Sequence, residues 1–326
     1  MMRLPAFRYL VPRTLDEAGR FLAEAGPGAQ LVAGGTDLYP NMKRLQVRPA
    51  VVVGLHALGE LAQVRRLDDG GLALGSGLTL TRLIEHPLVS QHCRALADAA
   101  LLISSPPLRN MGTLGGNLCL DTRCHFINQT AFWRGAVGSC LKDVGEVCLV
   151  APGSERCWAI TSADLPPLLM ALGARVRLVS AQGERVLPLG DLYHDDGIHY
   201  LTLAQGEILA EVLLPPLEGV RAVYLKLRRR GTFDFPALGV AAAVRAEGGG
   251  VCRAAHIVLG AVTSRPLAMP QAEQLVGQPL TPEAIAGVAE AMMRQARPLH
   301  LADFTHSYRK QMVAVYVSRA LRQLAN

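Results

Sequence analysis

Four cysteines in the middle of the chain have a spacing that suits metal ligation. From Cys124 the pattern is C-x15-C-x7-C-x8-C, and it ends at Cys157. Four thiolates can hold either Zn²⁺ or a [4Fe–4S] cluster. Structural zinc sites usually carry C-x2-C pairs, which this pattern lacks, and ligands so widely spaced in a glycine-containing stretch favour the cluster. The expected ligands are Cys124, Cys140, Cys148 and Cys157.

The other cysteines and the neighbouring basic residues bear on this interpretation. The chain has seven cysteines, an odd number, so a disulfide framework is not expected. Cys119 lies between two leucines in a strand pattern and is expected to be a core residue. A set of unrelated buried cysteines remains the alternative to a metal site. The basic residues that stand beside the expected ligands and could offset the charge of a cluster are Arg123, Arg134, Lys142 and Arg156.

Two glycine-containing loops could bind a pyrophosphate. Leu31–Asp37 (LVAGGTD) is a short strand that runs into a glycine turn, and Thr113–Asn117 (TLGGN) repeats this chemistry later in the chain. Such turns expose backbone N–H groups, and the Thr36 hydroxyl adds a donor. The first strand is not followed by G-x-G-x-x-G, and the loop lacks the lysine of a P-loop. One such loop alone is more often structural, but two together favour a dinucleotide site that is not of the Rossmann type.

Short elements must position the first of these loops. Thr14, with Glu17 three residues later, makes a capping box, and apolar residues then repeat at helical spacing up to Gly26. A strand at 30–33 leads into the loop, and a helix near 38–45 and a strand at 50–53 follow it. These elements predict a small α/β unit at the start of the chain.

The remaining elements indicate an α+β fold, because a run of strands precedes the last helices. The rest of the first domain has expected strands at 71–74, 174–179 and 207–214. Its expected helices are 80–84, 91–103 and 165–172. Pro215 and Pro216 close the last of these strands, and the domain boundary is placed there. The final part is expected to hold strands at 223–228, 237–246 and 251–259, a hairpin turn at 247–250, and helices at 282–295 and 307–324.

Composition limits the class of protein. The 326 residues are 50% apolar and 18% charged, which predicts a folded chain of about two domains. No apolar run approaches a membrane span and the N-terminus lacks a signal-peptide pattern, so a cytoplasmic protein is expected. The net charge is +6, but the basic residues are dispersed except at Arg228–Arg230, which argues against nucleic-acid binding. No Ser/His/Asp set can be assembled, so a hydrolase is disfavoured.

The two loops resemble the FAD loops of the flavoprotein subunits of the xanthine oxidase family. The segment 162–167 (SADLPP) is similar to the one whose Asp approaches the flavin in that family, and 303–309 (DFTHSYR) is similar to the start of its C-terminal helix. The resemblance implies bound FAD and an α+β fold: a two-part FAD-binding domain of the xanthine oxidase/CO dehydrogenase flavoprotein type, followed by a domain of antiparallel sheet and helices. It implies domains at 1–219 (with parts 1–55 and 56–219) and 220–326. The implied FAD contacts are Leu31, Val32, Ala33, Gly34, Gly35, Thr36, Asp37, Leu38, Ile103, Thr113, Leu114, Gly115, Gly116, Asn117, Asp164, Leu209 and Lys226.

The cysteine-rich insertion, at about 121–160, resembles that of the beta subunits of 4-hydroxybenzoyl-CoA reductases. This likeness implies a [4Fe–4S] cluster on the four cysteines and electron flow from ferredoxin through the cluster and FAD. The implied partners are a molybdopterin-binding large subunit and a [2Fe–2S] small subunit, in a dimer of heterotrimers. Substrate chemistry would then lie on the partners, and no catalytic residue is expected here. Three alternatives remain: a FAD subunit of a molybdenum hydroxylase that oxidises an aldehyde or N-heterocycle, a free-standing flavin oxidoreductase, and a zinc-stabilised binding module.

Overall fold

The computed structural model describes residues 3–247, 250–299 and 304–325. Its N-terminal part is a parallel three-stranded sheet of order β1-β3-β2. The strands are β1 (Arg8–Leu10), β2 (Ala29–Val32) and β3 (Val51–Gly54), and the helices are α1 (Leu15–Ala25) and α2 (Leu38–Lys43). The Thr14 hydroxyl accepts the backbone N–H of Glu17 at 3.1 Å, as the capping box predicts. Helix α2 starts directly after the first glycine loop.

The second part is an antiparallel five-stranded sheet of order β4-β5-β8-β6-β7 with helices beside it. The strands are β4 (Val64–Arg66), β5 (Leu72–Gly75), β6 (Arg175–Ser180), β7 (Gly183–Pro188) and β8 (Ile208–Leu214). The helices are α3 (Leu80–Glu85), α4 (Pro87–His92), α5 (Arg94–Leu101), α6 (Pro106–Arg109), α7 (Leu114–Leu118) and α9 (Leu165–Ala171). The 3₁₀ turns of the chain are Gly26–Gly28, Gly59–Ala62, Leu189–Leu192 and Pro270–Leu275.

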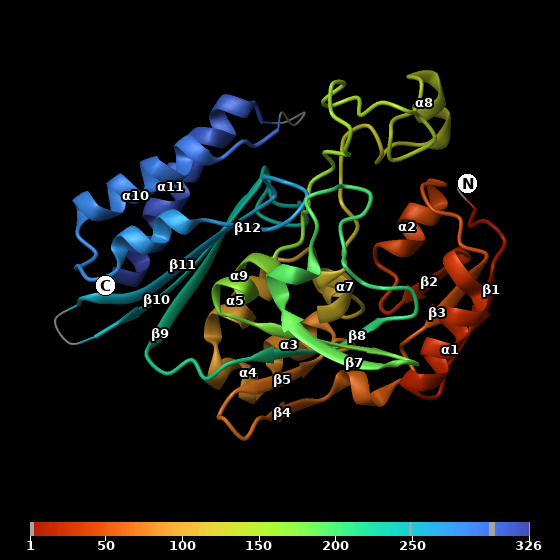
Figure 1. Cartoon of the computed structure of the whole chain (residues 1–326), viewed down its shortest axis with the longest axis horizontal. Helices are drawn as coiled ribbons and strands as arrows, with labels where there is room; N and C mark the ends of the chain where they lie inside the picture. The colour runs from red at the N-terminus through yellow and green to blue at the C-terminus, as the bar shows by residue number, and fades with distance from the viewer. Residues whose placement is uncertain (1–2, 248–249, 300–303, 326) are drawn as a thin grey trace.

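The C-terminal part is an antiparallel sheet of order β12-β11-β10-β9, covered on one face by two helices (Figure 1). Its elements are β9 (Val220–Leu227), β10 (Leu238–Ala246), β11 (Cys252–Gly260), β12 (Leu267–Ala268), α10 (Pro282–Gln295) and α11 (His306–Ala325). Val240, Ala242 and Val244 of β10 pack toward α10 and α11, whereas Ala241 and Ala243 belong to the core of the second part. The strand is therefore buried on both faces and joins the two cores.

The cysteine-rich insertion rises from the body between the N-terminal and C-terminal parts (Figure 1). In the stretch 119–164, all of which is described, the one α-helix is α8 (Ala131–Ala136). The rest of the stretch has no helix or strand. Parts of it, including the segment that holds Cys124, line two pockets. In the described ranges, no helix is both long enough and apolar enough to span a bilayer.

Two expectations about local structure were wrong. The helix expected at 91–103 is divided at Cys93, whose φ of −153° is extended and which begins α5. Cys119 follows the last turn of α7 and does not lie in a strand. Its thiol is still shielded from water, and burial raises its pKa to about 12. Cys119 therefore keeps the inert character expected of a core residue.

Candidate functional site

The first glycine loop packs backbone against backbone on the segment before the second loop. A β-carbon on Gly34 would lie 1.9 Å from the Met111 carbonyl oxygen, so only glycine fits there. Gly35 has a φ of +69°, and a β-carbon on it would lie 2.4 Å from the Tyr39 ring. The N–H groups of residues 34–37 have no acceptor among the described residues. The first loop thus presents backbone donors of the kind that a pyrophosphate needs.

The second loop uses its N–H groups inside the protein. The Gly115 N–H donates to the Ser76 carbonyl at 2.7 Å, and the Gly116 N–H donates to the Thr113 hydroxyl at 3.1 Å. The Leu114 and Asn117 N–H groups are likewise bonded to backbone carbonyls. The N–H groups of residues 114–117 are therefore bonded within the protein, whereas those of residues 34–37 have no described acceptor.

A buried ion pair holds the next two expected FAD residues together. The Lys226 ammonium lies 2.9 Å from Asp164 Oδ2, and the Tyr224 hydroxyl donates to Asp164 Oδ1 at 2.9 Å. Lys226 also donates to the Leu102 carbonyl at 3.1 Å, directly before Ile103. Burial raises the pKa of Asp164 and lowers that of Lys226, while each partner opposes the shift of the other. The pair fixes the start of α9 against β9.

We expect Lys226→Met to lower the free energy of unfolding by about 2 kcal/mol at pH 8, because it leaves a buried carboxylate with Tyr224 as its main donor. The loss should be smaller at pH 5. Without the ammonium, burial keeps the pKa of Asp164 in the folded state above its value in the unfolded chain, which is about 3.9. Stability therefore falls as pH rises. Urea unfolding at both pH values checks this, with the exposed Lys43→Met as control. Equal losses at both pH values would contradict the buried pair.

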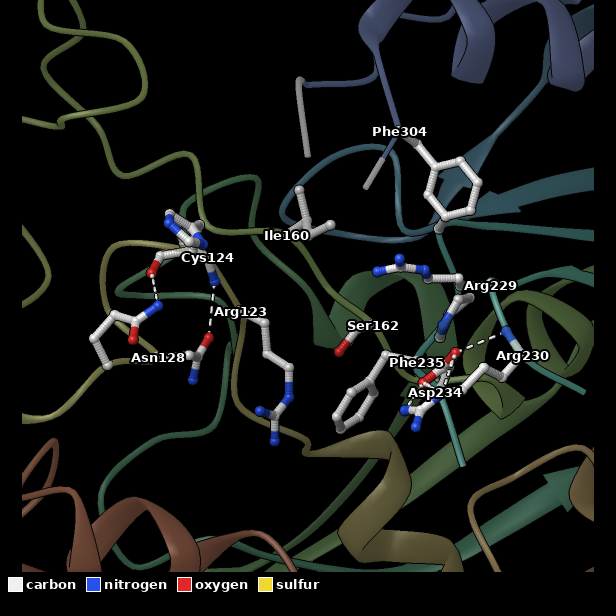
Figure 2. A pocket seen from close by; sticks show the side chains of 14 residues that line it. Arg123, Cys124, Asn128, Ile160, Ser162, Arg229, Arg230, Asp234, Phe235 and Phe304 are labelled. Carbon is white, nitrogen blue, oxygen red and sulfur yellow. Dashed lines mark hydrogen bonds and ion pairs between the residues drawn. The ribbon is translucent and has the colours of Figure 1, made fainter. Parts of the chain in front are cut away.

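A large cavity opens beside Arg123, the residue that pairs with Asp37 of the first loop (Figure 2). Its volume is about 830 Å³, and its walls come from the insertion, the segment that leads into α9, the 229–237 segment and Phe304. The Arg123 guanidinium pairs with Asp37 of the glycine loop and lies 4.0 Å from the centre of the Phe235 ring. Burial is the main cause of a raised pKa at Asp37, which the charge of Arg123 opposes. The buried Ser162 hydroxyl has no hydrogen-bond partner among the described residues and points into the cavity.

The four expected metal ligands line one small pocket. Cys124, Cys140, Cys148 and Cys157 meet there, together with apolar residues and Lys142. Burial raises the pKa of Cys124 and raises that of Cys157 to about 11, although the Lys142 ammonium opposes the latter shift. Within the described ranges, no three His, Cys, Asp or Glu side chains are close enough to hold a single ion. A group held by four cysteine thiolates needs four thiols around one space, and this pocket supplies them.

Each basic residue expected beside the cysteines is paired with a carboxylate. Lys142 lies 2.6 Å from Asp121 and donates to the Gly197 carbonyl at 2.7 Å. Arg156 lies 3.1 Å from Asp195. The other two pairs are Arg123 with Asp37 and Arg134 with Asp143. All four charges are therefore already matched by carboxylates. The Arg123 and Arg156 pairs also fasten the insertion to the body.

Comparison with known families identifies the chain. Residues 5–217 match the family described as the FAD binding domain in molybdopterin dehydrogenase. Residues 222–324 match the CO dehydrogenase flavoprotein C-terminal domain. This chain is a FAD-binding subunit of the molybdopterin dehydrogenase family. The expected α+β architecture and the expected FAD-binding domain are confirmed.

This FAD-binding subunit has relatives that match over nearly its whole length. The aldehyde oxidoreductase FAD-binding subunit PaoB of Escherichia coli K12 is 30% identical, over 98% of this chain and 100% of the relative. The carbon monoxide dehydrogenase medium chain of Hydrogenophaga pseudoflava is 27% identical, over 97% and 96%. Quinoline 2-oxidoreductase from Pseudomonas putida 86 superposes with a TM-score of 0.81 at 25% identity, covering 99% and 98%.

The fold of this FAD-binding subunit brings most of the expected FAD residues into one connected region. Asn117 accepts the Leu165 N–H at 3.1 Å and so ties the second loop to α9. Ile103 and Leu209 are buried in the same core as Leu114. Sequence reasoning missed Ser162, Phe235 and Phe304 in the cavity, and it missed the aspartates that pair with the basic residues. A carboxylate distant in sequence gives no local signal, so those pairs could not be foreseen.

Proposed function

We propose that this chain transfers electrons through bound FAD within a molybdenum-containing oxidoreductase complex. The observation that carries the proposal is the first glycine loop, whose free backbone donors lie in a domain of the FAD-binding family. FAD, when bound, exchanges electrons either singly or in pairs. The chain's own residues bind and orient it: Gly34–Asp37 offer donors to the pyrophosphate, and the walls of the adjacent cavity shelter the reacting end from water.

A second electron-transfer centre on the insertion is part of the proposal. Four thiols converge on one pocket, and Cys124 lines both this pocket and the large cavity. Thiolate is the ligand that iron–sulfur clusters require. We infer that Cys124, Cys140, Cys148 and Cys157 hold a [4Fe–4S] cluster. Because family membership makes the chain a flavoprotein subunit, a zinc-stabilised module without redox function is disfavoured.

The molybdenum site is proposed to lie on a partner. A large molybdopterin-binding subunit and a small [2Fe–2S] subunit would complete the complex, as a dimer of heterotrimers. The matched family is named for molybdopterin dehydrogenase, and the relatives are themselves called FAD-binding subunits or medium chains. These names support an assembly in which this chain supplies the flavin and another subunit carries the molybdenum site.

Two substrate classes have specific support. The relatives favour oxidation of an aldehyde or N-heterocycle, since one is an aldehyde oxidoreductase subunit and another is quinoline 2-oxidoreductase. The four-cysteine pocket favours the second candidate, reductive dehydroxylation of 4-hydroxybenzoyl-CoA to benzoyl-CoA with reduced ferredoxin as donor. An additional cluster suits a complex that takes electrons from a low-potential donor.

The purified complex separates the two candidates in one pair of assays. The reductive candidate predicts benzoyl-CoA from 4-hydroxybenzoyl-CoA with reduced ferredoxin or a low-potential dye, and at least about a tenfold lower rate in the Cys148→Ser complex. The oxidative candidate predicts that an aldehyde or N-heterocycle reduces an acceptor dye rapidly. Product analysis by mass spectrometry and dye absorbance measure both. Rapid oxidation without benzoyl-CoA would overturn the reductive candidate.

A further inference from the structure

Residues of the insertion hold helix α2 at both of its ends. At the N-terminal end, Asp37 pairs with Arg123. At the C-terminal end, the Arg134 guanidinium donates to the carbonyls of Arg44 and Leu45, at 3.1 Å in both cases. Just beyond, the Gln46 side chain donates to the Ile127 carbonyl. The helix that follows the first glycine loop is therefore fixed by the insertion as well as by its own sheet.

Arg134 is the buried centre of the C-terminal contact. Its side chain is only 3% exposed, and it also donates to the Gln129 carbonyl at 2.7 Å. A cation at this end of a helix favours its unpaired carbonyls. Leu45 has a φ of +58°, a left-handed conformation that is costly for a residue with a side chain, and Arg134 bonds to its carbonyl. Arg134 thus bonds to two carbonyls at an end of α2 where the backbone conformation is costly.

The same arginine reaches toward the four-cysteine pocket. Its Nε lies 3.0 Å from Asp143 Oδ2, and the Asp143 N–H donates to the Cys140 carbonyl at 2.8 Å. Ser139 donates to the Asp143 carboxylate at 3.1 Å. A continuous set of polar contacts therefore runs from the Cys140 segment through Asp143 and Arg134 to the end of α2.

We propose that Arg134 is a positioning residue for the flavin, which sets the first glycine loop through α2 and couples that loop to the four-cysteine pocket. The inference rests on the proposed function in taking Gly34–Asp37 as the pyrophosphate loop. A helix of six residues has little stability of its own, so its end contacts determine where it lies. Coupling of this kind is reciprocal: a filled cysteine pocket tightens FAD binding, and bound FAD tightens the hold on the metal.

Arg156 supplies a matched control. Like Arg134, it is an arginine of the insertion beside a cysteine ligand and paired with an aspartate. Its guanidinium also donates to the Asp195 carbonyl and, at 3.3 Å, to the Ser264 hydroxyl. The guanidinium carbon lies 3.8 Å from the centre of the Trp158 ring. None of these described contacts touches α2. Removing either arginine deletes one charge from the insertion, but only Arg134 should affect the flavin loop.

The test is FAD affinity in the full chain, measured by fluorescence titration of protein freed of flavin. Arg134→Met should raise the Kd for FAD about tenfold, Arg134→Lys should recover part of the loss, and Arg156→Met should change it less than about twofold. Removing iron should raise the Kd of the wild-type chain and leave that of Arg134→Met nearly unchanged. If Arg134→Met does not fold, Asp143→Asn removes the negative charge that pairs with Arg134 and should raise the Kd about threefold.

An unchanged Kd in Arg134→Met, or an equal rise in Arg156→Met, would overturn the proposal. Failure of the proposed function gives a different result. A chain that binds no iron contradicts the cluster, yet the comparison of arginine variants still tests the position of α2. A chain in which Gly35→Asp retains FAD contradicts the assigned loop itself, whatever the arginine variants show.

Discussion

Replacing Gly35 by aspartate should yield a folded chain that purifies without FAD. The backbone at Gly35 has a φ of +69°, which strains any residue with a side chain, and the new β-carbon would lie 2.4 Å from the Tyr39 ring. The carboxylate would also meet the negative pyrophosphate at the free N–H groups of the loop. Strain and like-charge repulsion together should weaken FAD binding by at least about a hundredfold.

Flavin absorbance per protein measures the result, and circular dichroism shows whether the variant is folded. Gly287→Asp is the matched control, because Gly287 is an exposed position in α10 where a β-carbon would have nothing within 4 Å. It adds the same charge far from the loop and should keep its full flavin content. Full occupancy in Gly35→Asp would contradict the assignment of the first loop to the pyrophosphate.

The sequence was sufficient for the features that depend on local pattern. Residues 238–244 of β10 are buried on both faces of the strand, so they form a continuous apolar run that needs no partner information to detect. The capping box at Thr14 and the glycine turn at Gly34–Gly35 are likewise local. The four cysteines were grouped by spacing alone, and their side chains line one pocket.

Features set by tertiary contacts were not predictable. The break at Cys93 follows a turn in which His92 Nε2 lies 3.0 Å from the Pro215 carbonyl, far away in sequence. The helical spacing of apolar residues continues through this point, so periodicity predicts one helix where contacts produce two. In the second glycine loop, likewise, the bond from the Gly115 N–H to the Ser76 carbonyl could not be read from the local sequence, and contact of this loop with FAD stays a prediction.

The cavity and the insertion show why a site is harder to predict than a fold. Arg123 follows Asp121 in a stretch without regular structure, yet it pairs with Asp37 from the first loop. Ser162 lies in a motif whose expected functional residue was Asp164, but Asp164 is enclosed by Lys226 and Tyr224, while Ser162 faces the cavity. The type of residue was informative in both cases, whereas its partner was determined only by folding.

Replacing Cys148 by serine should remove most of the iron from the purified chain. Cys148 is only 4% exposed and lines the pocket with the other three thiols, so no other described cysteine can replace it without moving the chain. A serine hydroxyl is a hard, weakly acidic ligand compared with thiolate. Iron should fall from about four atoms per chain to below about one, with a parallel loss of acid-labile sulfide.

Cys93→Ser is the control for this substitution. Cys93 lies outside the pocket, before the first turn of α5, so the iron content should be unchanged. FAD should stay bound to Cys148→Ser at saturating concentration, because Cys148 does not contact the first glycine loop, although the Arg134 link predicts a weaker affinity. Zinc without iron or sulfide in the wild-type chain would contradict the cluster. Unchanged iron in Cys148→Ser would instead show that this cysteine is not a ligand, since the pocket would then hold its metal with three thiolates.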